Sequence, residues 1–179
     1  MIAESFIETF KTRTELRWKT RQLDPRIYGF QFQAGTGWNI GLSDGSIDQY
    51  EGELGVRFPD GFRRFLKSMN GTDTPTVNVY GTTCQPVYGT GVYSYPADLE
   101  IVKERQRTVD RERREITLCL KDQGFELNPE ADLIPFFSHR FLLSDPGSPE
   151  IPVLSIHGVD AIVYASTFRG YLELEFLGG

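Results

Sequence analysis

The feature that most constrains the fold is the stretch from Ser43 to Gly71, whose pattern indicates two short helices joined at a proline. Ile47, Tyr50 and Leu54 recur at helical spacing, so they share one face of the first helix. The serine at its start can cap that helix, and the glycine directly after Leu54 suits a left-handed terminator. The pattern therefore predicts a helix that buries one apolar stripe and ends just beyond it.

A second helix is predicted after Pro59, because proline is tolerated in the first turn of a helix and breaks an interior one. Its apolar stripe consists of Phe62, Phe65, Leu66 and Met69. The Asn-Gly pair that follows can adopt the positive φ angles that end a helix. Nothing in the stretch is typical of a catalytic motif, so we interpret it as scaffold.

The same residues resemble the signature of the SUKH superfamily, in the pattern Ile-x-x-Tyr-Glu-x-x-Leu-Gly-x-x-Phe-Pro-x-x-Phe-x-x-Phe-Leu-x-x-x-Asn-Gly over residues 47–71. Later segments resemble its middle part, its closing strands and its last helix: 92–99, 133–136 and 165–172. The resemblance covers residues 40–177 in the right order. This Smi/Knr-like superfamily includes yeast cell-wall-synthesis regulators and many bacterial immunity proteins of polymorphic toxin systems.

The order of the predicted elements favours one α+β domain. The expected elements are a helix over 2–15, a strand near 28–32, the helix pair, short strands, a long helix over 96–123, strands at 133–137 and 140–143, a hairpin over 152–164, and a last helix capped by Ser166. Such layering predicts a single mixed β-sheet of about four to six strands, with helices packed mainly on one face. The domain is expected to span 1–179, with 1–38 as an N-terminal helix and strand extension and 39–179 as the family core.

Charge is segregated along the chain. The formal net charge is −6, and the segment from Lys103 to Glu115 holds six basic and four acidic residues, so it carries +2 and leaves −8 for the rest. We interpret this mixed-charge segment as a solvated helix face, with a basic docking strip as the alternative. The acidic remainder disfavours direct nucleic-acid binding and favours a basic protein partner. No apolar run approaches the ~20 residues that span a bilayer, and no signal-peptide pattern is present, so we expect a cytoplasmic protein without membrane contact.

Few residues suggest chemistry. The two histidines, His139 and His157, lack the ligand spacing of a zinc site, and Cys84 and Cys119 fit no metal pattern. We interpret the cysteines as inert thiols, with a single disulfide or a Cys–His dyad as alternatives. Glu51 is the one acid of interest, and it is expected to bond backbone or a basic side chain within the fold. We therefore expect no enzyme activity, no metal and no cofactor.

The segment between the helix pair and the long helix is predicted to carry the partner-binding surface. It is rich in threonine, glycine and tyrosine and holds a single charge. In binding loops, tyrosines supply rigid contact area and small polar residues adapt around them. The candidate contact residues are Asp73, Tyr80, Tyr88, Tyr93 and Tyr95. Tyr93 and Tyr95 also lie in a segment that resembles the family, so core packing is the alternative for one or both.

The resemblance implies a non-enzymatic protein-binding function, that of a bacterial immunity protein that binds and neutralises a cognate toxin. An acidic protein suits a basic toxin, for example a nuclease. Two alternatives come from other classes: an intracellular scaffold or regulator that binds host proteins, and an enzyme that acts on a small molecule in a sheet–helix cleft. An adjacent toxin gene is expected only for the immunity protein. The sequence leaves the identity of the toxin and the oligomeric state open.

Overall fold

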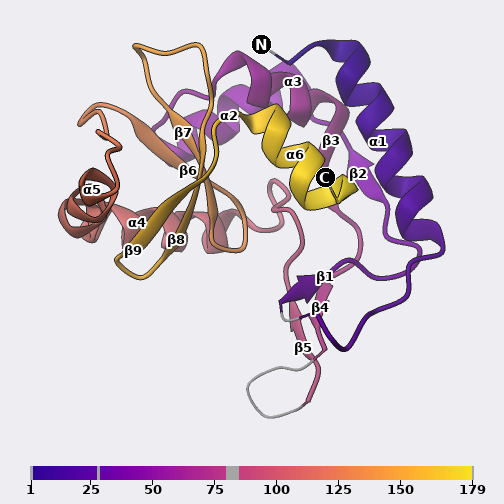
Figure 1. Ribbon diagram of the computed structural model, residues 1–179. Helices are drawn as coiled ribbons and strands as arrows, with labels where there is room; N and C mark the ends of the chain where they lie inside the picture. Colours follow the sequence, from indigo (N-terminus) through magenta and orange to yellow (C-terminus); the bar gives the residue numbers. More distant parts are fainter. Residues whose placement is uncertain (1, 28, 80–84, 179) are drawn as a thin grey trace.

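The computed structural model describes residues 2–27, 29–79 and 85–178, and it combines helices with short antiparallel strands (Figure 1). The helices are α1 (Glu4–Lys19), α2 (Asp44–Leu54), α3 (Asp60–Ser68), α4 (Leu99–Arg111), α5 (Arg113–Asp122) and α6 (Phe168–Leu177). The strands are β1 (Phe30–Gln31), β2 (Trp38–Ile40), β3 (Met69–Thr72), β4 (Thr76–Asn78), β5 (Val87–Gly89), β6 (Asp132–Phe137), β7 (Arg140–Ser144), β8 (Val153–His157) and β9 (Asp160–Ala165). This mixture confirms the predicted α+β class.

The two predicted helices of the 43–71 stretch are present, and local chemistry explains their ends. The Ser43 hydroxyl accepts a hydrogen bond from the Ser46 N–H at 3.2 Å and caps α2. Gly55 ends α2 in the left-handed conformation with a φ of 68°, and its N–H donates to the Glu51 carbonyl oxygen. Helix α3 begins directly after Pro59, as the fixed φ of proline predicts.

Helix α3 lies in the larger of two apolar clusters. Phe65 is fully buried, and its ring centroid lies 5.3 Å from that of Phe136 in β6 and 5.5 Å from that of Phe168 in α6. Trp38 of β2 meets the Phe65 ring edge-on at 5.6 Å. Phe62, Phe65 and Leu66 are buried, which confirms the predicted face of this helix. Met69, predicted as its last apolar residue, is also buried but begins β3, because the helix ends at Ser68.

Helix α1 is longer than expected, because it runs to Lys19 instead of about residue 15. Thr14 and Trp18 point inward from the second half of the helix and are fully buried, while the basic residues around them face solvent. The Trp18 ring stacks on Phe32 at a centroid distance of 4.5 Å. One inward residue per turn is a sparse apolar stripe, so the sequence pattern did not reveal this part of the helix.

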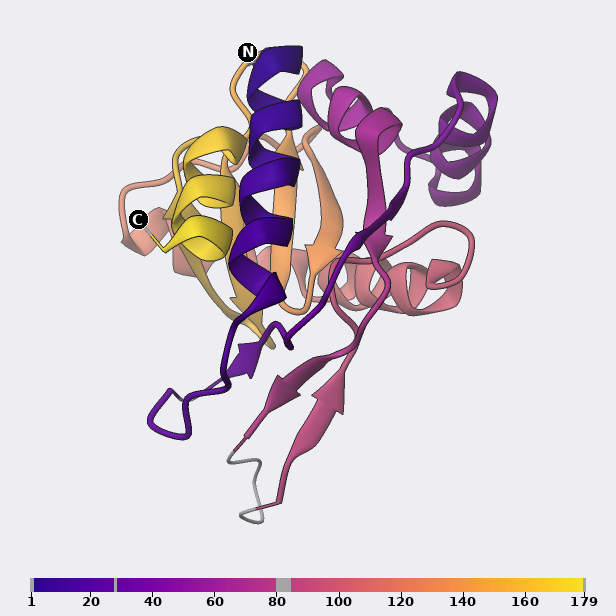
Figure 2. The same cartoon turned by 90° about the vertical axis from the view of Figure 1, so that its right-hand side faces the viewer.

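The main sheet has four antiparallel strands in the order β6-β7-β8-β9, and helices cover both of its faces (Figures 1 and 2). On one face, Ile134 and Phe136 join the cluster that includes α1, α3 and α6. On the other face, Leu133 and Phe141 pack in a second cluster with α4 and α5. The structure thus differs from the expected one-sided packing. Five of the six β6 residues are buried, as is typical of a strand covered on two sides.

The other described strands form two small sheets instead of extending the main one. β2 pairs with β3, and β1, β4 and β5 form a separate three-stranded sheet, which we call the hairpin arm (Figure 2). Gly71 turns the chain at a φ of 74°, where an added Cβ would lie 2.6 Å from the Cβ of Ser94. These strands are two to four residues long, and each pairs only within its own small sheet. Of the strand expected near 28–32, only β1 is present, and Tyr28 lies outside the described residues.

The long helix expected over 96–123 is two helices, α4 and α5, separated at Glu112. Helix α4 contacts β6 and α5 contacts β9, so the break lets each segment follow the twisted sheet. Arg113, which interrupts the apolar spacing, stands at this break. Within the described residues, no helix is both long and apolar enough to cross a membrane.

The C-terminal elements follow the prediction closely. The expected hairpin is confirmed as β8–β9, with His157 opposite Asp160. The last helix starts one residue later than predicted. Its cap is Thr167, whose hydroxyl accepts a hydrogen bond from the Gly170 N–H at 3.0 Å, whereas Ser166 was expected in that role.

Candidate functional site

Glu51, the carboxylate that the sequence marks for attention, joins the two helices of the scaffold. Its side chain is buried. One carboxylate oxygen, Oε1, accepts a hydrogen bond from the Phe58 N–H at 2.7 Å, and the other, Oε2, lies 2.7 Å from Arg63 Nη1. Glu51 therefore bonds both backbone and a basic side chain within the fold, in agreement with its expected structural role.

Asn70 fixes the segment that carries Tyr95. Its Nδ2 donates to the Tyr95 carbonyl oxygen at 2.7 Å, and its Oδ1 accepts from the Tyr95 N–H at 2.8 Å. Asp98 Oδ2 accepts from the backbone N–H and the hydroxyl of Ser94 at 2.8 and 2.9 Å. These bonds satisfy buried backbone groups, so Asn70 and Asp98 act as structural residues.

His139 lies in the turn between β6 and β7, and His157 is the last residue of β8; their ring centroids are 6.3 Å apart. Burial, followed by the charge of Arg140, lowers the pKa of His139 to about 4, so this ring is neutral at pH 7. The Cys119 sulfur lies 3.4 Å from a backbone carbonyl oxygen, and Cys84 lies outside the described residues. In the ranges 2–27, 29–79 and 85–178, no three His, Cys, Asp or Glu side chains are placed to hold a metal ion.

The five predicted contact residues differ in their burial and placement. Tyr93 and Tyr95 expose only 6% and 8% of their surface. The Tyr93 hydroxyl donates to the Ser138 carbonyl oxygen at 3.0 Å, and the Tyr95 ring stacks on Tyr50 at 4.6 Å. Both therefore pack in the core, as the alternative interpretation expected. Tyr80 lies outside the described residues.

Asp73 and Tyr88 are the two candidates that the structure brings together at the surface. Both line a shallow hollow of about 370 Å³ beside the hairpin arm. Tyr88 lies on β5 and exposes 65% of its surface, and Phe30 and Val87 add apolar surface on the same arm. Asp73 Oδ1 accepts a hydrogen bond from the Gly37 N–H at 2.8 Å, so Asp73 also anchors the arm.

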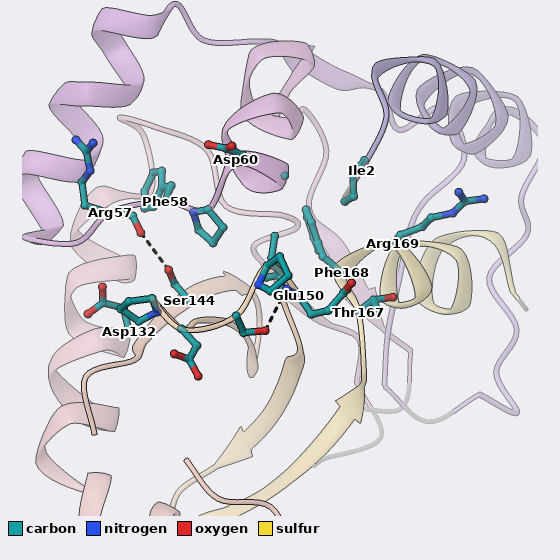
Figure 3. A pocket seen from close by; sticks show the side chains of 17 residues that line it. Ile2, Arg57, Phe58, Asp60, Asp132, Ser144, Glu150, Thr167, Phe168 and Arg169 are labelled. Atoms are coloured by element: carbon teal, nitrogen blue, oxygen red, sulfur yellow. Dashed lines mark hydrogen bonds between the residues drawn. The ribbon is translucent and has the colours of Figure 1, made fainter. Parts of the chain in front are cut away.

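A larger groove lies between the start of α3, the loop after β7 and the start of α6 (Figure 3). This α3–α6 groove has a volume of about 700 Å³. Its lining comes from five separate parts of the chain: residue 2 and segments 57–61, 132, 144–151 and 167–169. No local pattern could reveal a site assembled in this way. The nearest signal is the Asp-Pro-Gly-Ser-Pro sequence at 145–149, which indicates only a loop.

A family model covers most of the fold described above. The model of the SMI1/KNR4 family (SUKH-1) matches residues 41–173, from just before α2 to the middle of α6. A comparison with curated proteins finds no significant match. The matched range is well over half of the 179 residues and contains the motif residues Glu51, Asn70 and Gly71. The chain therefore belongs to the SMI1/KNR4 family (SUKH-1).

Proposed function

We propose that this chain is an immunity protein, which binds and neutralises a cognate toxin protein in the bacterial cytoplasm. Membership of the SUKH-1 family supports this proposal, because the superfamily includes many bacterial immunity proteins. Such a function requires a stable scaffold and a shaped contact surface. It requires no catalytic residue, metal or cofactor.

The observation that carries the proposal is the hairpin arm, which projects from the body of the molecule (Figure 2). Its exposed side chains include Phe30 and Val87, which share one face of the arm, and Tyr88, which the alternation of β5 places on the other face. Several exposed apolar side chains on one projecting element are typical of interaction surfaces. Tyrosine is well suited to such a surface, because it offers a flat apolar body and a polar tip with few rotatable bonds.

Hydrogen bonds hold the base of the arm in place. The Asp73 N–H donates to the Gly37 carbonyl oxygen at 3.0 Å, which adds to the bond from Gly37 to the Asp73 carboxylate. Gln33 Nε2 donates to the Pro75 carbonyl oxygen at 2.7 Å, and the Thr76 hydroxyl donates across to β5 at 3.1 Å. A preformed surface loses little conformational entropy on binding, which favours affinity.

The charge distribution favours a basic toxin. Residues 103–115 carry +2 and the rest of the chain −8, so a cationic partner is steered toward most of its surface. A nuclease that binds an anionic substrate is one toxin class with this property.

The test is neutralisation of the toxin encoded beside this gene. Co-expression of this chain should restore growth to cells that produce the toxin. The Tyr88→Ala variant should bind the toxin about 30-fold more weakly, the loss expected for a contact worth about 2 kcal/mol. Its melting temperature should stay unchanged, because Tyr88 is largely exposed. Leu16→Ala on α1 is the matched control, since Leu16 is 68% exposed and lies on a separate element.

Two outcomes count against the proposal. Unchanged affinity of the Tyr88→Ala variant would remove the hairpin arm from the contact surface. A gene neighbourhood without a toxin, together with capture of a host protein by the arm, would favour the alternative function of an intracellular scaffold or regulator.

A further inference from the structure

The α3–α6 groove has an apolar floor with a fixed shape. The floor is formed by Ile2, Phe58, Ile151 and Phe168, which are all buried members of the larger apolar cluster. Figure 3 shows Phe58, Ile2 and Phe168 around the start of α3. The Ile2 carbonyl oxygen accepts a hydrogen bond from Arg64 Nη1 at 3.2 Å, so the N-terminal wall of the groove is tied to α3.

The opposite wall is the loop after β7, and its own hydrogen bonds hold it in shape. Asp145 Oδ1 accepts from Asn128 Nδ2 and from the Gly147 N–H, both at 2.8 Å. The Ser148 hydroxyl accepts from the Glu150 N–H at 3.2 Å (Figure 3). The groove therefore exists before any partner binds, which lowers the entropic cost of binding.

The lining of the groove is acidic, and two of its carboxylates are exposed to a cationic partner. The acidic lining residues are Asp60, Asp132, Asp145 and Glu150. Among the residues that the structure describes, none of the four forms an ion pair. Asp60 and Glu150 are exposed and lie on the α3 wall and the loop wall respectively.

The two basic side chains of the groove already have partners. Arg169 Nε lies 3.2 Å from Glu173 Oε1, and its guanidinium covers the Phe6 ring at 4.5 Å. Arg57 Nη1 lies 3.8 Å from Glu51 Oε2. The lining holds four acids and two arginines, a formal charge of −2, so the field within the groove is negative.

We propose that the α3–α6 groove binds an extended segment of a partner protein, in which apolar side chains are flanked by Lys or Arg. The apolar side chains lie on the floor, and the flanking cations meet Asp60 and Glu150. Ile2 lies outside the matched residues 41–173, so one wall comes from the N-terminal segment of this chain. The inference adds a second contact surface to the proposed function and rests on it only in taking the partner to be a protein.

The test uses short synthetic peptides and needs no toxin, so its failure and that of the hairpin-arm proposal are distinguishable. The probe is the acetylated and amidated octapeptide GKRFLRKG. One control peptide has glutamate at the four basic positions, and a second has Gly-Ser in place of Phe-Leu. Binding is followed by NMR of isotope-labelled isoleucine methyl groups. We expect the probe to shift the Ile2 and Ile151 signals, while the signal of Ile116, buried under α5, stays in place. The glutamate peptide should not bind, and the Gly-Ser peptide should bind more weakly.

Matched charge variants separate local contacts from the overall negative charge. The Asp60→Asn/Glu150→Gln variant should raise the Kd of the probe about threefold to tenfold, as expected for the loss of two exposed ion pairs. The Asp122→Asn/Glu126→Gln variant makes the same change in net charge outside the groove lining and should bind as the unmodified chain. Equal affinities of the two variants, equal binding of the glutamate peptide, or no shift at Ile2 and Ile151 would each overturn the proposal.

Discussion

Replacement of Glu51 with alanine is expected to lower the free energy of unfolding by about 3–5 kcal/mol. The Phe58 N–H, which donates to Glu51 at 2.7 Å, would be left buried without an acceptor, at a cost of about 1–3 kcal/mol. The charge-assisted contact with Arg63, also 2.7 Å long, contributes about 1.5–3 kcal/mol. Arg63 itself keeps a partner, because its Nη2 lies 2.7 Å from Asp48 Oδ1. The loss is therefore set mainly by the buried N–H and the lost contact.

Glu51→Gln is the matched variant, because its amide oxygen can still accept from the Phe58 N–H, while an NH2 group replaces the oxygen that faces Arg63. Its expected loss is about 1.5–3 kcal/mol, the contribution of the lost contact with Arg63. Urea unfolding measures both values, and for a chain of this length each kcal/mol corresponds to roughly 2–4 °C in Tm. Equal losses for the two variants, or a loss below about 1 kcal/mol for Glu51→Ala, would refute the assignment of the buried N–H as the main cost.

Three further predictions concern the core, the pH dependence and the association rate. Phe65→Ala should lower the free energy of unfolding by about 3–5 kcal/mol, because the ring is fully buried among other aromatic rings; a loss near that of the exposed-site variant Leu118→Ala would contradict this. The pKa of His139 is lowered from 6.5 to about 4, so the unfolded chain takes up a proton below pH 6.5 that the folded chain does not. Urea unfolding should therefore show a stability loss of about 1 kcal/mol between pH 7 and pH 5, after allowance for the partial exposure of the ring. His139→Gln should abolish this loss of stability, and His157→Gln should retain most of it. A loss that His157→Gln abolishes and His139→Gln retains would show that His139 is not its cause. The association rate with a basic partner, measured by stopped flow, should fall as salt rises from about 50 to about 500 mM, and a flat rate would exclude electrostatic steering.

Local signals in the sequence were sufficient to predict the two helices of the scaffold. The stripe that includes Phe65, the terminator Gly55 and the proline at position 59 each act within one turn of helix, so their effects can be predicted without the rest of the chain. The roles of Glu51 and Asn70 depend on partners up to 25 residues away. Glu51 was expected to bond within the fold, but its particular partners could be identified only in the structure.

The features that could not be predicted from the sequence depend on packing between distant parts of the chain. Tyr88, Tyr93 and Tyr95 have the same residue type and lie within eight positions, yet one is exposed on the hairpin arm and two are buried against the scaffold. Trp18 is buried because Phe32, Trp38 and Phe176 converge on it, which no pattern within α1 indicates. The α3–α6 groove was missed for the same reason, since its walls are brought together only by the fold.

The central claim is that this chain neutralises a protein partner through its hairpin arm. Amide hydrogen exchange of the chain, alone and bound to the protein encoded beside its gene, tests this claim most directly. We predict slower exchange on binding at 73–78 and 85–91, the segments that hold Asp73 and Tyr88, with unchanged exchange in α5. A complex that protects only α4 and α5, or no complex at micromolar concentrations, would contradict the account.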